Sequence, residues 1–379
     1  MNFAFSDEQE ELKKSARRFC EEQYSSETVR RIMETESGVD EELWTRMAQE
    51  LGWQAMIIPE EYGGAGFGYI ELIVLMEEMG RAVVAAPFFS TVCLAANTLL
   101  VAGSDEQKQE LLPGIAEGTR IATLALTEES GRWDADGVMA TYSKNGGDYT
   151  LNGKKMYVVD GHTANTIIVA ARAEGSTGED GVSLFVVDAE ASGLSRRPLQ
   201  TMDQTRKQAE VTLDGVSVAG SALVGEEGNA WLAVTKVMDL ASVALAAEQV
   251  GGAQMCLDMS VDYAKVRVQF GRPIGSFQAI KHKCADMLVE VESAKSAAYY
   301  AGWAAREDNE ELPITAPLAK AYCSEAYFHC AAENIQIHGG IGFTWEHDAH
   351  LYFKRAKSSE LMLGDPSYHR ELLAQRIGL

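Results

Sequence analysis

The spacing of the hydrophobic residues changes twice along this chain of 379 residues, and those changes restrict the fold more than any single motif does. Apolar residues recur three and four positions apart in 41–51 and 70–83, which is the period of an amphipathic helix. From Ile121 onward, short apolar segments typical of strands take over. No helical segment separates them, so they predict an antiparallel sheet or barrel and not a doubly wound fold. Long segments rich in helix-forming residues return after Gly228 and predict helices over 231–262, 276–306 and 314–337.

The order of helices, strands and helices predicts an α+β chain. A chain of this length exceeds one ordinary core and suggests several domains. The expected domains are an N-terminal helical domain over 1–120, a middle β domain over 121–226 and a C-terminal helical domain over 227–379.

Short local signals mark where some elements begin and end. Ser6 is a cap-type residue that precedes several acids, so it predicts a helix N-terminus. Gly339-Gly340 predicts the end of the last long helix. Asn152-Gly153 and Asp214-Gly215 are dipeptides typical of tight turns. The glycines in 59–68 superficially resemble a dinucleotide-binding loop, but the acids beside them favour a connection between helices.

The charge balance excludes one broad class of partner. The chain carries 33 basic and 56 acidic residues, a net charge of −23, and such a surface repels phosphate backbones. We therefore expect no nucleic-acid partner. A local basic cluster can still hold a phosphorylated cofactor, and the sequence offers one in Arg267, Arg272, Lys281 and Lys283.

The remaining composition favours a cytoplasmic protein. The N-terminal residues show no basic stretch followed by an apolar core, so no signal peptide is expected, and no window is apolar enough for a membrane span. The six cysteines form no C-x-x-C pair and need not form disulfides. His347 and His350 lack supporting ligands in the sequence, so no metal site is expected.

Two segments near the C-terminus carry the most specific signal. The first is YAKVRVQFGRPIGSFQAIKHKCADM over 263–287, and the second is QIHGGIG over 336–342. Together with Thr127-Glu128, the stretch 152–157 and Val224-Gly225, they closely resemble the acyl-CoA dehydrogenase family over essentially the whole chain. Members of that family are flavoproteins that remove hydrogen from Cα and Cβ of acyl thioesters.

The resemblance implies FAD as the cofactor. In the family, an Arg and a Gln of the first segment reach the flavin cofactor of a neighbouring subunit, with a Phe packing nearby, and the second segment contacts the adenosine diphosphate part. An arginine suits a pyrophosphate because it donates charge-assisted hydrogen bonds, and glycines let backbone N–H groups approach closely. The residues so assigned are Thr127, Arg267, Phe270, Gln278, Gln336, Ile337, His338, Gly339 and Gly340.

The resemblance also implies a C-terminal four-helix bundle and a particular set of partners. Because the flavin sites are built across subunits, we expect a homodimer or homotetramer with mostly helical interfaces. The implied substrate is an acyl-CoA, and the implied electron acceptor is an electron-transfer flavoprotein.

The catalytic base is where the chain departs from the family. The chemistry needs a carboxylate that accepts the α-proton while the flavin accepts a hydride from Cβ. Most members place a Glu just before a Gly after the last motif, and this chain has Leu363 there. A second group places the Glu on the first long helix of the last domain, followed by Arg, and the matching residues here are Ala241 and Ser242. None of these side chains is a carboxylate.

Two nearby carboxylates are the candidate catalytic residues. Glu248 lies seven residues after Ala241, so it faces the same way but sits about 10 Å farther along the helix. It interrupts an apolar run, which fits a displaced base, a polar contact for an unusual acyl group, or a structural salt bridge or hydrogen bond. Asp365 lies two residues past the usual position and fits either a shifted base or a helix cap. Glu360 is more typical of a solvated helix residue.

Further departures lie at the thioester end of the site. Trp133 stands where relatives have a small Ser, and Val159 stands where a Thr commonly approaches the flavin ring. Three hypotheses remain open. The chain is a self-sufficient FAD-dependent dehydrogenase that forms a trans-2-enoyl-CoA, or a base-lacking subunit that joins a base-bearing homologue in a hetero-oligomer, or an oxidase that uses O₂.

Overall fold

The computed structural model describes residues 5–379, and the chain divides into two compact units. We call Met1–Arg31, Tyr69–Val84 and Ser242–Leu379 the helical unit, and Ile32–Gly68 and Ala85–Ala241 the sheet unit. Each unit therefore combines segments that are far apart in the sequence. The predicted α+β class, with N-terminal helices, a middle β-sheet and C-terminal helices, is confirmed.

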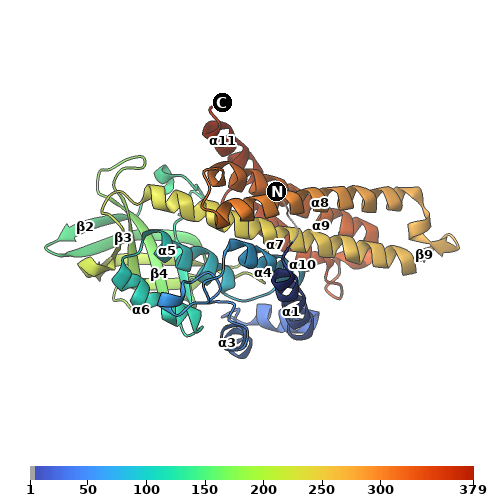
Figure 1. Ribbon diagram of the computed structural model, residues 1–379, viewed down its shortest axis with the longest axis horizontal. Helices are drawn as coiled ribbons and strands as arrows, with labels where there is room; N and C mark the ends of the chain where they lie inside the picture. Colours follow the sequence, from blue (N-terminus) through green and yellow to red (C-terminus); the bar gives the residue numbers. More distant parts are fainter. Residues whose placement is uncertain (1–4) are drawn as a thin grey trace. The chain divides into compact units, whose positions relative to one another are not determined.

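The helical unit is dominated by three long C-terminal helices, and Figure 1 shows α7 and α8 joined by the hairpin that contains β9. All three long helices that the sequence predicts are present. The elements that lie wholly or partly in this unit are α1 (Asp7–Gln23), α2 (Ser26–Glu34), α4 (Tyr69–Arg81), α7 (Trp231–Val266), β9 (Val268–Gln269), β10 (Arg272–Pro273), η5 (Ile274–Ser276), α8 (Gln278–Arg306), α9 (Leu312–His338), η6 (Gly339–Phe343), α10 (Ala349–Leu361) and α11 (Pro366–Arg376).

The predicted cap of the first helix is confirmed. Ser6 and Gln9 form a capping box, in which each side chain accepts a hydrogen bond from the backbone N–H of the other residue. Helix α1 then packs on α4 through two ion pairs, in which Lys13 Nζ lies 2.9 Å from a carboxylate oxygen of Glu77, and Arg17 binds Glu78 through two nitrogens. Glu77 and Glu78 are buried, and these cations compensate their charges.

Helices α4 and α7 cross at a point where glycine is required. A Cβ added to Gly80 would lie 2.0 Å from the carbonyl oxygen of Glu248, and one added to Gly251 would lie 1.8 Å from that of Glu77. Both contacts are with backbone, which cannot move aside without separating the helices. The neighbouring Gly252 accommodates the ring of Tyr327, whose Cζ would lie 2.3 Å from an added Cβ.

The sheet unit contains the β-strands β1 to β8 and several shorter helices. Its elements are α3 (Glu41–Gln49), η1 (Glu60–Tyr62), η2 (Phe89–Ala96), α5 (Asn97–Ala102), α6 (Asp105–Ala116), β1 (Ala122–Ala125), η3 (Ala135–Gly137), β2 (Thr141–Asn145), β3 (Asp148–Val159), β4 (Thr166–Ala173), β5 (Val182–Asp188), β6 (Leu194–Pro198), β7 (Gln208–Val218), η4 (Gly220–Ala222) and β8 (Leu223–Val224). The glycine-rich stretch 59–68 forms the short helix η1 and turns, as the sequence predicts.

The strands form one eight-stranded sheet in the order β6-β7-β3-β2-β4-β5-β8, with β1 beside β4. Most neighbours are antiparallel, but β1 and β2 both run parallel to β4, so the sheet is mixed. The sequence predicts an antiparallel sheet or barrel, and these two pairings are exceptions to the antiparallel arrangement. The parallel pairing of β2 with β4 arises because the chain reverses in β3 before β4, which pairs with β2 and not with β3.

The two turn dipeptides were predicted wrongly. Asn152-Gly153 lies inside β3 and Asp214-Gly215 inside β7, and these neighbouring strands change register there. Asn152 Oδ1 accepts a hydrogen bond of 2.9 Å from the backbone N–H of Gly215. The glycines therefore allow an irregularity within a long paired ribbon, where glycine also fits well, and they do not form hairpin turns.

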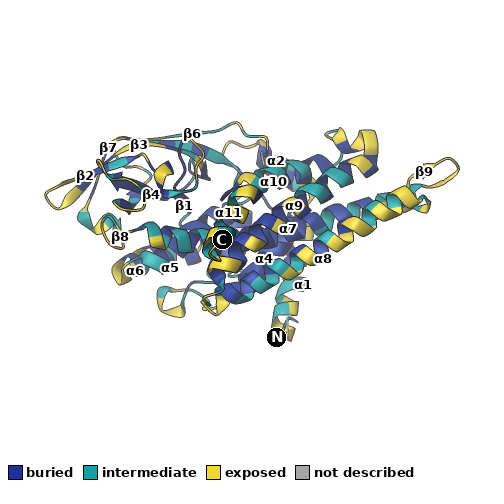
Figure 2. Ribbon diagram, turned by 90° about the horizontal axis from the view of Figure 1, so that it is seen from above, coloured by how far each residue is buried: buried dark blue, intermediate teal, exposed yellow. Residues whose placement is uncertain are grey.

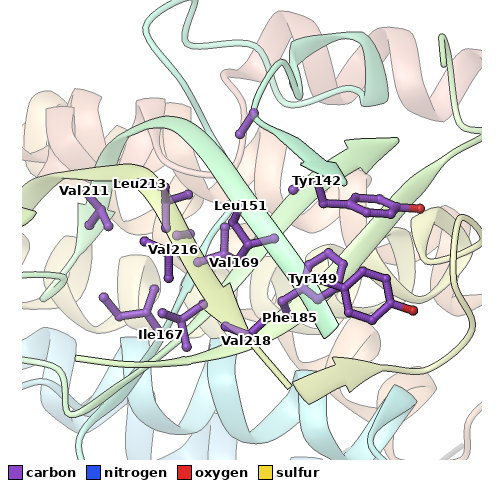
Figure 3. Packing of buried hydrophobic residues seen from close by; sticks show 14 of the residues in the cluster. Tyr142, Tyr149, Leu151, Ile167, Val169, Phe185, Val211, Leu213, Val216 and Val218 are labelled. Carbon is purple, nitrogen blue, oxygen red and sulfur yellow. The ribbon is translucent and has the colours of Figure 1, made fainter. Parts of the chain in front are cut away.

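The core of the sheet unit consists of buried side chains from the strands that pack against one another, as Figure 3 shows. Tyr142, Tyr149 and Phe185 come from three different strands, and their ring centroids lie 5.0–5.7 Å apart in edge-on or tilted contacts. Aromatic rings prefer these arrangements to face-to-face stacking. Within residues 5–379, no helix combines the length and the apolar character that a membrane crossing requires.

Candidate functional site

The first predicted flavin segment forms a hairpin that connects α7 with α8. Gln269 of β9 pairs with Arg272 of β10, which leaves Phe270 and Gly271 as a two-residue turn. Both turn residues have positive φ, 51° and 77°, as a type I′ turn requires. A bulky residue rarely adopts this conformation, so Phe270 stands at a strained position.

The hairpin exposes the side chains that the sequence assigns to the cofactor. The ring of Phe270 is 91% exposed and meets Phe277 edge-on, with 6.1 Å between centroids. The guanidinium of Arg272 lies 4.2 Å from the Phe277 ring centroid. Arg267 and Gln278 are exposed as well, and Figure 2 shows the hairpin as an exposed end of the two helices. An aromatic residue this exposed, beside two arginines, favours an interaction with a ligand or another chain.

The second predicted segment, at the C-terminal end of α9, lies at the same end of the helical unit. The ring of His338 stacks on that of Tyr263 with 4.3 Å between centroids, and the carbonyl of Tyr263 accepts a hydrogen bond from the backbone N–H of Arg267. His338 Nδ1 donates to the carbonyl of Asn334, and burial lowers the pKa of this imidazole. The structure therefore brings the two motifs together within one chain.

The residues at this end fit a phosphorylated cofactor. Among residues 5–379, the side chains of Arg267, Gln278 and Gln336 have no hydrogen-bond or ion-pair partner, so their donors are available to a ligand. Gly339 and Gly340 have open space where a Cβ would stand, which leaves their backbone approachable. These residues would hold the phosphates and the adenosine part of FAD.

The other residues assigned to the cofactor have different environments. Ile337 is buried in the core of the helical unit, so its side chain has a packing role. Thr127 belongs to the sheet unit, where its hydroxyl donates a hydrogen bond of 2.8 Å to the carbonyl of Met156. The cofactor assignments of these two residues remain predictions.

Both positions where relatives have the base are buried and apolar. Ala241 is completely buried in α7, and Leu363 is 2% exposed in the connection between α10 and α11. Leu363 has a φ of 63°, in the left-handed region that bulky residues rarely adopt. The backbone at this position therefore forms a strained turn that carries a buried apolar side chain.

Glu248 is engaged in a buried ion pair. Its Oε1 accepts a hydrogen bond of 3.1 Å from Nη1 of Arg355 on α10, and both side chains are almost fully buried. Nη2 of Arg355 also donates to the carbonyl of Val84, just after α4. The pair therefore connects α7, α10 and the end of α4, which is a structural role. That Glu248 acts as a base remains a prediction.

Asp365 and Glu360 also have structural partners. Asp365 is the N-cap of α11, and its Oδ1 accepts a hydrogen bond of 2.8 Å from the backbone N–H of Tyr368. Glu360 forms an ion pair of 2.9 Å with Lys357, one turn earlier on α10. The capping role agrees with one of the two interpretations of Asp365, and its catalytic role remains a prediction.

The sequence reasoning missed a buried lysine that holds the turn around Leu363. Lys320 on α9 is fully buried, and its Nζ donates to Ser324 Oγ at 2.9 Å and to the carbonyls of Glu360 and Gly364 at 3.1 Å each. Nε2 of His369 donates to the carbonyl of Leu363 at 3.0 Å. Burial lowers the pKa of Lys320 to about 7 and that of His369 to about 3. The available signal was a lone lysine inside an apolar stretch of a predicted helix.

A second buried lysine fixes the segment that follows β1 in the sheet unit. Lys155 Nζ lies 2.7 Å from Glu128 Oε1, and the same oxygen accepts hydrogen bonds from the backbone N–H groups of Met139 and Ala140. Burial lowers the pKa of Lys155 to about 8. Because residues 129–138 lie between these contacts, the pair fixes the base of the loop that carries Trp133.

Three family models match the chain in series. They are the acyl-CoA dehydrogenase N-terminal domain over residues 6–119, the middle domain over 123–216 and the C-terminal domain over 228–378. The acyl-CoA dehydrogenase IpdE2 of Mycolicibacterium smegmatis is 37% identical over 363 residues, which cover 95% of this chain and 96% of that protein.

Two solved structures show the same fold over the whole chain. Butyryl-CoA dehydrogenase from Megasphaera elsdenii has a TM-score of 0.93 and 29% identity, with full coverage of both chains. A chain of the ChsE4–ChsE5 complex from Mycobacterium tuberculosis has a TM-score of 0.90 and 27% identity, with 100% of this chain and 99% of that chain covered. The chain thus belongs to the acyl-CoA dehydrogenase family and is an FAD-dependent flavoprotein oxidoreductase that acts on the CH–CH bond of acyl-CoA.

Proposed function

We propose that this chain is one subunit of a hetero-oligomeric acyl-CoA dehydrogenase, and that a homologous partner chain carries the proton-accepting carboxylate. The reaction is the α,β-dehydrogenation of an acyl-CoA to the trans-2-enoyl-CoA. The observation that carries the proposal is the buried Leu363 in the strained turn where relatives have their Glu. A leucine cannot accept a proton, and positioned general bases typically accelerate such steps by about 10²–10⁴-fold.

The other carboxylates near these positions support the same proposal. Glu248 is held by Arg355, and Asp365 caps a helix, so moving either one to a substrate would break an existing interaction. Removing one partner of a buried ion pair costs roughly 3–5 kcal/mol. A carboxylate supplied by another chain avoids that cost.

The exposed hairpin gives this subunit a role even without a base. When bound, FAD accepts the hydride from Cβ of the substrate. Arg267 and Gln278 would bind the cofactor of the neighbouring subunit, and Phe270 would pack beside it. The two-chain complex of ChsE4 and ChsE5 gives a precedent for assembly with a different chain. We propose that electrons leave to an electron-transfer flavoprotein and that the protein works in the cytoplasm, where its free cysteines stay reduced.

A self-sufficient homodimer or homotetramer is the second candidate. The observation in its favour is that Glu248 is a buried carboxylate on the same helix as Ala241, seven residues farther along. Buried ionisable groups are often functional. In this case Arg355 would have to release Glu248 when the substrate binds.

The absorbance spectrum of the flavin separates the two candidates. The chain is purified alone and reconstituted with FAD, and a panel of acyl-CoAs is added without oxygen. We expect the yellow colour to persist with every acyl-CoA, and to bleach only after co-expression with a homologue that has Glu at the position of Leu363. Rapid bleaching of the isolated chain would contradict the proposal, and Glu248→Gln and Asp365→Asn would then identify the base.

A further inference from the structure

The turn between α10 and α11 has a backbone conformation that residues other than glycine rarely adopt, although the turn carries no base. Leu363 and Gly364 have φ values of 63° and 105°, both in the left-handed range. A Cβ at Gly364 would also lie 2.3 Å from the ring of Tyr368. A non-glycine residue in such a region costs on the order of 1–3 kcal/mol and persists only where the surroundings impose it.

Lys320 holds the backbone of the turn in this conformation through hydrogen bonds from its ammonium group. An ammonium group has three N–H donors, and the three acceptors around Lys320 Nζ match them. Two of these acceptors are the carbonyls of Glu360 and Gly364, which lie on either side of Leu363 in the sequence. The carbonyl of Leu363 itself is held by His369. Side chains from α9 and α11 therefore hold three backbone carbonyls of the turn.

The lysine is itself held in place by buried neighbours. Its third acceptor, Ser324 Oγ, accepts a hydrogen bond of 3.0 Å from Gln249 Nε2 on α7. All three side chains are completely buried. The contacts that fix the turn thus come from α7, α9 and α11, and none of them involves the side chain at position 363.

We propose that Lys320 is a positioning residue, and that the turn it holds would position a catalytic carboxylate placed at residue 363. In that case Leu363→Glu gives the isolated chain its own base. The α-proton of the acyl-CoA would pass to the new carboxylate as the Cα–H bond breaks, the hydride from Cβ would pass to FAD, and the Cα–Cβ double bond would form. The inference rests on the proposed function, because both assume that the missing base is what disables the chain.

The first test compares Leu363→Glu with Leu363→Gln in the isolated chain after reconstitution with FAD. Both replacements bury a polar side chain of nearly the same size, and only one can accept a proton. We expect Leu363→Glu to bleach the flavin with an acyl-CoA at least about 100-fold faster than Leu363→Gln. Equal rates would overturn the proposal. A Leu363→Glu protein that stays colourless after reconstitution would also overturn it, because the carboxylate would not then be the missing component.

The second test asks whether Lys320 positions that carboxylate. Adding Lys320→Met to Leu363→Glu should slow bleaching at saturating acyl-CoA by at least about tenfold and leave the acyl-CoA dissociation constant unchanged, because small misplacements cost rate steeply. Lys357→Met is the matched control, since Lys357 contacts the carboxylate of Glu360, whereas Lys320 contacts its backbone carbonyl. A double variant that bleaches as fast as Leu363→Glu would refute the role of Lys320.

Hydrogen exchange gives a reading that does not depend on turnover. In the otherwise unchanged chain, Lys320→Met should raise exchange at the amides of 361–369 at least about tenfold, and Lys357→Met should not. Unchanged exchange in Lys320→Met would refute the role of the lysine even if the chain folds normally. The proposed function fails by a different result, namely rapid bleaching of the unmodified chain alone, so the two failures are distinguishable.

Discussion

Replacing Glu248 by Gln is expected to destabilise the protein, because Glu248 and Arg355 form a buried ion pair. At the observed separation of 3.1 Å, the attraction between unit charges is about 5 kcal/mol for an effective dielectric constant of about 20. Glutamine keeps a neutral acceptor in place, but the buried guanidinium of Arg355 loses the charge of Glu248. We therefore expect the free energy of unfolding to fall by about 3 kcal/mol, at the lower end of the usual range for a broken buried pair.

A double-mutant cycle in urea measures this coupling. The four proteins are the unmodified chain, Glu248→Gln, Arg355→Gln and the double variant, and unfolding is followed by circular dichroism. We expect the double variant to lose at least about 2 kcal/mol less than the sum of the two single losses, because each single loss already contains the attraction between the two charges.

The sign of the effect distinguishes a structural carboxylate from a catalytic one. A group that is held for chemistry is often kept at a cost in stability, so its removal tends to stabilise the protein. If Glu248→Gln were as stable as the unmodified chain or more so, the structural interpretation of the pair would be refuted, and Glu248 would return as the candidate base.

Three further predictions concern Gly364 in the turn, His369 beside it, and the buried pair of Lys155 with Glu128. Gly364→Ala should lower the free energy of unfolding by about 2 kcal/mol or more in urea, because of its positive φ and its clash with Tyr368, and an unchanged midpoint would contradict the described turn. His369 has a pKa lowered to about 3 by burial, so its contribution to stability is present above the unfolded pKa of about 6.5 and is lost as the pH falls toward 3. His369→Gln should therefore lose less stability than the unmodified chain between pH 6.5 and pH 4, and parallel losses would count against this assignment. Lys155→Met should cost about 3 kcal/mol, because Glu128 is left buried without its cation, and melting at the temperature of the unmodified chain would argue against that pair.

Periodicity and local signals were sufficient to predict most of the architecture. The three long C-terminal helices and the cap at Ser6 depend on residues that are close in sequence. The dipeptide Asn152-Gly153 misled because glycine serves a turn and a strand irregularity equally well, and only the pairing of β3 with β7 distinguishes them. The parallel pairing of β1 with β4 could not be predicted, since it depends on which strands become neighbours.

The candidate site was likewise predictable from the sequence only in part. Leu363 and Ala241 were identified from the sequence as positions without a base, because a missing carboxylate is visible residue by residue. The partner of Glu248 was not visible, because Arg355 lies 107 residues away and no short-range pattern connects the two. Likewise, the three acceptors of Lys320 include two backbone carbonyls, which carry no signal in a sequence.

The close crossing of α4 and α7 has a consequence for attempts to engineer this protein. Stability is commonly improved by replacing helical glycines with alanine, since glycine costs about 1 kcal/mol in a helix. Gly80 and Gly251 would be selected by that rule, but a single added methyl group at either one would meet the backbone of the opposite helix. A library for thermostable variants should therefore keep both codons fixed. Deep mutational scans should find these two positions intolerant of every substitution, whatever the acyl-CoA supplied.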